Sequence, residues 1–209
     1  MLAFVAEEVR SIVGLGVQLA VVVGGGNIFS GCCRLLLWHG AYLGRSHGHA
    51  GHGAQQFGPA GCPGKKGIQT RVQTAITMHQ VAEPYILRRA LRHLEKGRVV
   101  IFAAGSGNPY FTTDTAAVLR AKEIHAEILL KATKVNGLYD SDPERNADAR
   151  FIKTISYMEV LERQLKVMDM TAISLAMDNQ LPLMVFNLKE KGNIFRVVCG
   201  EDVGTTISG

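Results

Sequence analysis

The first part of the chain has apolar residues on a helical spacing, followed by a short apolar run that ends in glycine. Residues 2–13 repeat apolar side chains every three or four positions, which predicts a helix ending at Gly14 and Gly16. Residues 17–23 are mostly apolar and β-branched, as is typical of a buried strand. Three glycines follow directly at 24–26, so a turn is expected where this strand ends.

From Gly67 onward, strand-like and helix-like patterns alternate. This alternation predicts an α/β fold with a mainly parallel sheet covered by helices on both faces. The predicted strands cover residues 70–77, 98–104, 127–133, 183–187 and 196–199, and the predicted helices cover 85–96, 113–120, 158–167 and 169–179.

Residues 32–64 follow neither pattern. They contain three of the four cysteines, the single tryptophan and four of the seven histidines. His47, His49, His52 and Cys62 suggest a zinc site, but their spacing fits no established zinc template, so we predict no metal site. We treat 32–64 as an aberrant segment within a single domain spanning 1–209.

Composition narrows the class of protein. With 209 residues and 47% hydrophobic content, the chain is long and apolar enough for a full core and is not disordered. A net charge of +5 suits an anionic ligand such as a nucleotide, although scattered Lys and Arg would give the same value. No basic run with interleaved aromatics suggests nucleic-acid binding. Without a disulfide framework, signal peptide or membrane-spanning run, we expect a cytoplasmic protein with no membrane partner.

Two glycine-rich turns are candidates for binding phosphate. Residues 24–27 and 105–109 each follow a predicted buried strand, where main-chain N–H groups can approach a ligand. A plain tight turn explains 24–27 equally well. After the second turn, hydroxyls and an amide at 106–113 can bond a polar ligand. Asp114 lies at the start of the next helix, as either a cap or a functional carboxylate.

Further charged residues follow later in the chain. Lys131 and Lys134 can stabilise charge on a transferring phosphoryl group, while a solvated loop is the simpler interpretation of each. Asp169 begins a predicted helix, either as its cap or as a carboxylate that organises nearby lysines.

Four stretches together resemble the bacterial UMP kinases of the amino-acid kinase family. They are Gly-Gly-Gly-Asn-Ile-Phe at 24–29, Gly-Ser-Gly-Asn-Pro-Tyr-Phe-Thr-Thr-Asp at 105–114, Leu-Lys-Ala-Thr-Lys-Val at 130–135 and Leu-Lys-Val-Met-Asp at 165–169. The resemblance covers 1–31 and 67–209. It implies an α/β/α sandwich of three layers that uses ATP and Mg²⁺ to convert UMP to UDP. It also implies a hexamer activated by GTP.

The resemblance also assigns residues. Beside it, the residues themselves make Lys131, Lys134, Asp114 and Asp169 the candidate catalytic residues, with the two aspartates as organisers. By position, the resemblance assigns the nucleotide contacts. It places UMP at Gly25, Ser106, Gly107, Asn108, Pro109, Tyr110, Phe111, Thr112 and Thr113, and ATP at Gly26, Ser30, Thr133, Tyr139 and Asp142.

The chain departs from the family pattern in three places. Ser30 stands where the family has an ATP-side arginine. The family begins with a strand ending in Lys-Leu-Ser-Gly, and we expect this chain to lack it. A UMP-binding aspartate and a helix rich in Met, Leu and Ala are replaced by 32–64.

We hypothesise that residues 32–64 are family sequence read in a shifted frame. Codons can be chosen for 47–53 that, read one base later, encode Met-Gly-Met-Leu-Ala-Thr, and 54–64 can give Leu-Asn-Ser-Leu-Ala-Leu-Gln-Asp-Ala-Leu-Glu in the same way. Codons can also be chosen for Arg45-Ser46 that encode the missing aspartate when they are read in the shifted frame. Each apolar side chain lost with that helix removes about 1.5–3 kcal/mol. Whole-domain stability is only about 5–15 kcal/mol, so we expect the chain as written to fold poorly and to be nearly inactive.

The sequence thus favours phosphoryl transfer from ATP to UMP, carried out mainly by positioning and charge neutralisation. Two alternatives remain: a related amino-acid (carboxylate) kinase, and an inactive or non-catalytic nucleotide-binding member of the family.

Overall fold

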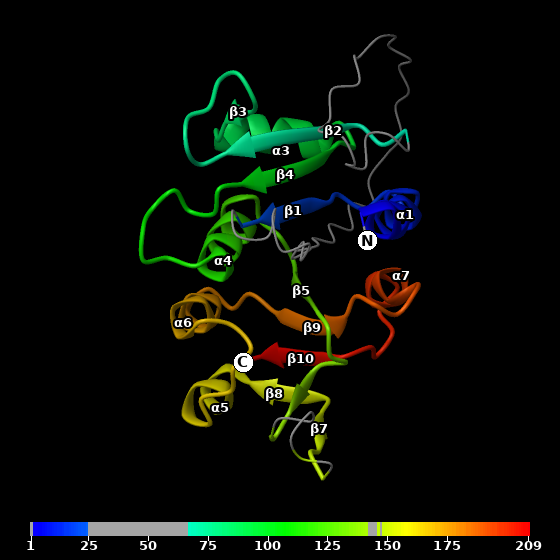
Figure 1. Cartoon of the computed structure of the whole chain (residues 1–209), viewed down its shortest axis with the longest axis vertical. Helices are drawn as coiled ribbons and strands as arrows, with labels where there is room; N and C mark the ends of the chain where they lie inside the picture. Colours follow the sequence, from blue (N-terminus) through cyan, green and yellow to red (C-terminus); the bar gives the residue numbers. More distant parts are fainter. Residues whose placement is uncertain (1, 25–66, 142–145, 147) are drawn as a thin grey trace.

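The strands form two four-stranded sheets and one short ribbon in the computed structural model, which describes residues 2–24, 67–141, 146 and 148–209 (Figure 1). One sheet has the order β1-β4-β2-β3, the other β5-β9-β10-β8, and β6 pairs with β7. The strands are β1 Ala20–Val23, β2 Thr70–Thr74, β3 Glu83–Pro84, β4 Val99–Ala103, β5 Leu129–Thr133, β6 Leu138–Tyr139, β7 Phe151–Ile152, β8 Thr154–Ser156, β9 Leu183–Asn187 and β10 Thr205–Ser208.

Parallel pairing dominates, which confirms the predicted sheet type. All three pairs of the first sheet are parallel, as are β5 with β9 and β8 with β10. Only the pairs β9 with β10 and β6 with β7 are antiparallel among the described strands.

Helices cover both faces of the sheets and give the three predicted layers. Residues of α3, α4, α5 and α6 contribute to one apolar core, and residues of α1 and α7 contribute to a second. Figure 1 shows α1 beside α7 at one side of the molecule and α4, α6 and α5 along the other. The helices are α1 Leu2–Val13, α3 Leu87–Glu95, α4 Thr113–Glu123, α5 Tyr157–Glu162, α6 Met170–Asp178 and α7 Asn193–Val198.

The central strands separate the two cores by alternation. In β1, Ala20 and Val22 join the core beneath α3 to α6, while Val21 joins the core beneath α1 and α7. Successive side chains of a strand point to opposite faces, so a strand buried on both sides must be apolar throughout. This explains the continuous apolar runs in β1 and β4.

One predicted element is wrong, and several short strands were not predicted. Residues 196–199, predicted as a strand, lie largely in helix α7, where Ile194 and Val197 are buried three positions apart. The β-branched Val-Val pair suggested a strand, but packing against α1 outweighed that local preference. Strands of two to four residues, such as β10, are too short to show a period of two.

Five helices end with the same reversal of the backbone. In α6, the N–H of Leu181 donates to the Ala176 carbonyl and the N–H of Gln180 donates to Met177, with Gln180 at φ 50°. Helices α3 and α7 have glycine at the equivalent left-handed position, whereas α4, α5 and α6 have side chains there. A residue with a Cβ is strained in this conformation.

We therefore expect Gln180→Gly to stabilise the protein by about 1 kcal/mol, because glycine adopts the left-handed region without steric cost. The Gln180 side chain is exposed. Urea unfolding would measure the gain. Asp178→Gly, an exposed change inside the same helix, should instead destabilise it by about 0.5–1 kcal/mol. A loss of stability in both variants would contradict the prediction.

Candidate active site

The ends of three parallel strands come together around the start of α4. A Cβ added to Gly24, just after β1, would lie 2.1 Å from Oγ1 of Thr113, so the Thr113 side chain packs closely against the Gly24 backbone. A Cβ on Gly107, after β4, would lie 3.2 Å from the carbonyl oxygen of Ala75, which follows β2. The carboxyl ends of parallel strands are where open α/β sheets bind ligands. The described end of the first glycine turn and the second glycine turn therefore share one region.

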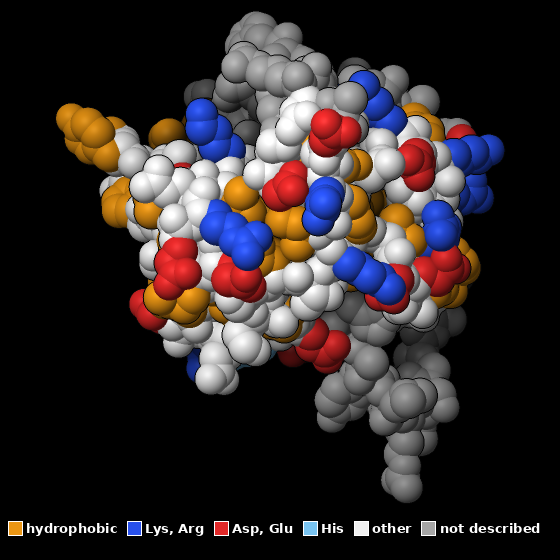
Figure 2. Space-filling model, turned by 90° about the horizontal axis from the view of Figure 1, so that it is seen from below, with side chains coloured by type: hydrophobic (Ala, Val, Ile, Leu, Met, Phe, Trp, Pro, Cys, Tyr) orange, Lys and Arg blue, Asp and Glu red, His pale blue; other side chains and the backbone are white. Residues whose placement is uncertain are grey.

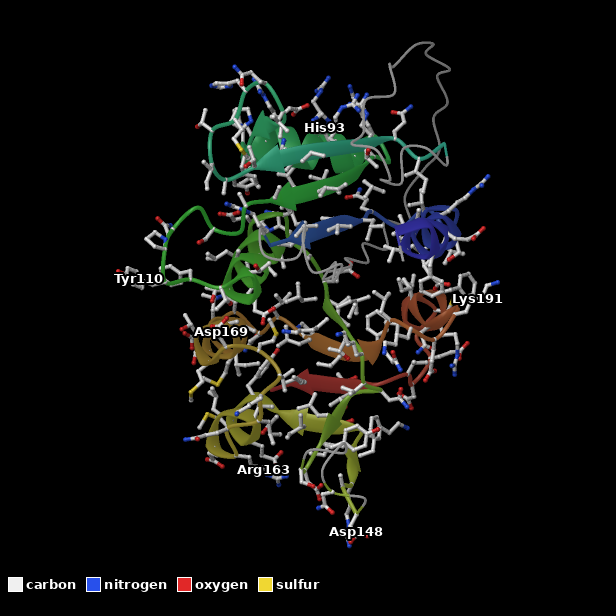
Figure 3. The ribbon with its side chains drawn as sticks, in the orientation of Figure 1. His93, Tyr110, Asp148, Arg163, Asp169 and Lys191 are labelled. Atoms are coloured by element: carbon white, nitrogen blue, oxygen red, sulfur yellow. The ribbon has the colours of Figure 1, made fainter. Side chains whose placement is uncertain are left out.

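The turn between β4 and α4 has an unusual backbone. Ala104, Gly105, Gly107 and Tyr110 all have positive φ, at 65°, 62°, 77° and 72°. Non-glycine residues rarely adopt this region, and such strain concentrates at functional sites. The Ser106 hydroxyl accepts a hydrogen bond from the N–H of Asn108 at 3.2 Å. Tyr110 lies at the tip of the turn, fully exposed and directed away from the body (Figure 3).

Polar side chains fix the start of α4. The Thr112 hydroxyl accepts from the N–H groups of Asp114 and Thr115 and thereby caps the helix. Asp114 is therefore not the cap that the sequence allowed. Its carboxylate instead accepts a hydrogen bond from Lys131 of β5, with Nζ 2.6 Å from Oδ2 and both side chains under 10% exposed. This buried ion pair joins the first helix after the glycine turn to the second sheet.

Asp169 links the first turns of two helices. It caps α6 by accepting from the N–H of Ala172 at 2.8 Å, as one of its two predicted roles required. It also accepts from the hydroxyls of Thr112 and Thr115 at the start of α4. Figure 3 shows Asp169 where α4 and α6 meet. Two helix N-termini, each with a partial positive charge, therefore point toward one carboxylate.

The surroundings of Asp169 keep it charged. Burial by itself would raise the pKa of this carboxyl, but hydrogen bonds from Thr112, Ala172 and Thr115, with the charge of Lys131, bring the pKa below its usual value of 3.8. Asp169 is thus an anion at neutral pH. The stability that it contributes is present above pH 3.8 and is lost as pH falls through the lowered pKa.

A cavity of about 340 Å³ lies beyond the end of β5. Thr133 and Tyr139, both predicted to contact ATP, line it together with the segment 164–167. That segment continues directly into Asp169. The Tyr139 ring packs edge-on against the Phe151 ring, with 5.5 Å between the ring centroids, and this contact fixes one wall of the cavity. The volume is within the range of small-molecule sites.

The structure brings many of the predicted residues together, but not all. Lys134 is exposed and is not among the residues that line the cavity. Thr115 was not predicted: its role depends on a contact 54 positions away in the chain. Predicted site residues that lie outside the described part are Gly25, Gly26, Ser30 and Asp142.

In the part of the chain that the structure describes, no group of three or more His, Cys, Asp and Glu side chains is arranged to hold a metal ion. The His and Cys residues of 32–64 lie outside that part. No helix within it has the length and apolar character needed to cross a membrane.

Comparison with known proteins places this arrangement in a family. Residues 2–187 match the amino acid kinase family. The chain belongs to that family. It is 53% identical over 210 residues to the chloroplastic uridylate kinase PUMPKIN of Arabidopsis thaliana, a match that covers 98% of this chain and 61% of that protein. The chain thus spans about three-fifths of the length of this curated relative.

Solved structures of this family are similar in fold as well. The UMP kinase of Bacillus anthracis has a TM-score of 0.79 and 34% identity, covering 99% of this chain and 86% of its own. The UMP kinase of Ureaplasma parvum has a TM-score of 0.65 and 35% identity over 69% of this chain and 62% of its own. Both are consistent with an amino-acid kinase fold.

We expect Lys131→Met to destabilise the protein by about 3–5 kcal/mol, because it leaves the Asp114 carboxylate buried without its ammonium partner. Lys131→Met combined with Asp114→Leu should cost clearly less than the single change. Chemical denaturation of both variants would measure this. Lys153→Met is a control, since Lys153 pairs with Asp202 at the surface and should cost only about 0–1 kcal/mol. Equal losses for the single and double variants would contradict the buried-pair interpretation.

Proposed function

We propose that this protein is a UMP kinase that transfers the γ-phosphoryl group of ATP to UMP. The observation that carries the proposal is the convergence of the 105–113 turn, the Lys131–Asp114 pair and Asp169 at the start of α4. The cavity of about 340 Å³ is lined by Lys166 and Val167, shortly before Asp169 in the chain. Identity to proteins named uridylate or UMP kinase supports the same substrate. UMP would lie against 105–113, with Gly25 in the first glycine turn, and ATP against Thr133 and Tyr139.

In this mechanism a phosphate oxygen of UMP attacks the γ-phosphorus of ATP in line. The new P–O bond forms as the bond to ADP breaks, and the electron pair of that bond leaves with ADP. Catalysis depends on position and on charge neutralisation. Lys131 would supply positive charge near the transferred group, while Asp114 and Asp169 would hold that lysine and the two helix starts in place. Lys134 is a second candidate donor.

Magnesium would enter with ATP. Mg²⁺ prefers oxygen ligands and in kinases is bound largely by phosphates with few carboxylates. In the described ranges, no side-chain cluster could hold it without the nucleotide. When bound, the ion neutralises phosphate charge, and the positioning roles of the chain's own residues are separate from it.

The test of function is product formation by the purified chain. Incubation with ATP and UMP should give UDP and ADP, at a rate well below that of ordinary kinases for the chain as written, whereas acetylglutamate or aspartate as acceptor should give none. Phosphorylation of a carboxylate would favour the amino-acid kinase alternative. Binding of UMP without UDP would favour a non-catalytic subunit.

We expect Asp169→Asn to lower kcat by about 10²–10³-fold, because the neutral amide no longer organises Lys131 and the two helix starts. Steady-state UDP formation measures the loss. Asp178→Asn changes an exposed carboxylate at the other end of α6 and should leave kcat unchanged. Equal rates for Asp169→Asn and the parent would contradict this role.

The frame hypothesis gives a separate prediction. A chain in which 47–64 is replaced by the amino acids that the shifted frame encodes should be more stable than the chain as written. It should also be at least about 100-fold more active. Both should be assayed side by side. Resequencing the gene is the direct check, because codons that do not encode the family sequence in the shifted frame would exclude the hypothesis. If neither chain binds or phosphorylates UMP, the proposed function is wrong.

Assembly and effector remain predictions from family resemblance, and the compartment remains a prediction from the sequence. We propose a hexamer that GTP activates, to be measured by light scattering and by UDP formation with and without GTP.

On the face seen in Figure 2, Lys and Arg lie among Asp and Glu around an apolar area, so charge there does not favour nucleic acid. A reducing compartment is expected, and the cytoplasm is our prediction although the plant relative is named chloroplastic.

A further inference from the structure

We propose that Thr115 is a positioning residue that holds the Asp169 carboxylate between the starts of α4 and α6. The Thr115 hydroxyl is 3.0 Å from Oδ1 and 3.1 Å from Oδ2 of Asp169. Thr115 is only 2% exposed, so this hydroxyl is shielded from water and from ligands. The assignment rests on the proposed function for its effect on catalysis, although the contact itself does not.

The direction of this hydrogen bond is unusual for a helical threonine. Threonine hydroxyls in helices commonly bond to a carbonyl three or four residues earlier on the same helix. Here the hydroxyl instead reaches a carboxylate that lies 54 positions later in the chain, on a different helix. The hydrogen bond therefore links α4 to the start of α6, and it does not form part of the hydrogen bonding within α4.

Thr112 and Thr115 donate to the same carboxylate but differ in their surroundings. Thr112 is exposed, belongs to the turn that we propose for UMP, and also caps α4. A ligand in that turn can compete for its hydroxyl. Thr115 is out of reach of such a ligand, so it can keep Asp169 oriented when UMP binds. The two threonines thus divide ligand contact and carboxylate positioning between them.

The hydrogen bond from Thr115 should have a measurable effect on the pKa of Asp169, because nearby charges are not all that stabilises this carboxylate. The charge of Lys131 on β5 favours the ionised form of Asp169, although Lys131 is paired with Asp114 of α4. Lys166, in the segment before α6, is exposed. Asp169 therefore depends on hydroxyl and N–H donors as well as on these charges. Removing one buried donor should make the charged form less favourable.

The test compares Thr115→Val, which keeps the shape but lacks the hydroxyl, with Thr115→Ser, which keeps the hydroxyl. The ¹³C shift of the Asp169 carboxyl is followed against pH by NMR. We expect a midpoint below 3.8 in the parent and in Thr115→Ser, and a higher midpoint in Thr115→Val. This readout does not require that UMP be the acceptor, so it separates failure of this inference from failure of the proposed function.

The kinetic readout follows from the same variants. For UDP formation, Thr115→Val should lower kcat about 10–100-fold with KM for UMP little changed, and Thr115→Ser should restore kcat. An unchanged Asp169 midpoint in Thr115→Val, or equal loss of kcat in the Ser and Val variants, would overturn the inference. If Thr115→Val does not fold, an unchanged kcat and midpoint in Thr115→Ala, which also lacks the hydroxyl, would overturn it equally.

Discussion

The carboxylate of Asp169 is the interaction on which the site depends. It accepts hydrogen bonds from the first turn of its own helix and from two threonines at the start of α4. Helix starts carry partial positive charge, and one anion placed between two of them neutralises both. Without that anion, two like partial charges would face each other at the centre of the site. Asp169 therefore makes the close approach of α4 and α6 favourable.

A second carboxylate performs a different task close by. Asp114 is buried with Lys131, and the pair joins α4 to β5 of the other sheet. A buried ion pair adds little net stability compared with apolar packing, yet it is costly to break. Its presence is better explained by a need for a fixed charge at this position than by stability. In the phosphoryl transfer that we propose, the Lys131 ammonium would supply this charge and stabilise the negative charge on the transferred group.

The sequence predicted the buried parallel strands from their continuous apolar runs and the longer helices from the helical spacing of their apolar residues. It predicted α7 wrongly, since four residues with two adjacent valines resemble a strand until the packing against α1 is known. It left both Asp114 and Asp169 open between cap and functional carboxylate. The structure assigns the cap of α4 to Thr112 and the cap of α6 to Asp169. Thr115 could not be predicted, because no local pattern reports a partner 54 positions away.

The end of α5 connects the cavity to the charged cluster. Gln164 takes a left-handed conformation, at φ 49°, and turns the chain out of the helix. The next residues line the cavity of about 340 Å³, and the same segment ends at Asp169. The left-handed residue thus sets where both the cavity wall and the carboxylate lie. A short, continuous stretch of backbone therefore joins the cavity to Asp169, so the nucleotide that we propose for this cavity would contact the segment that leads to that carboxylate.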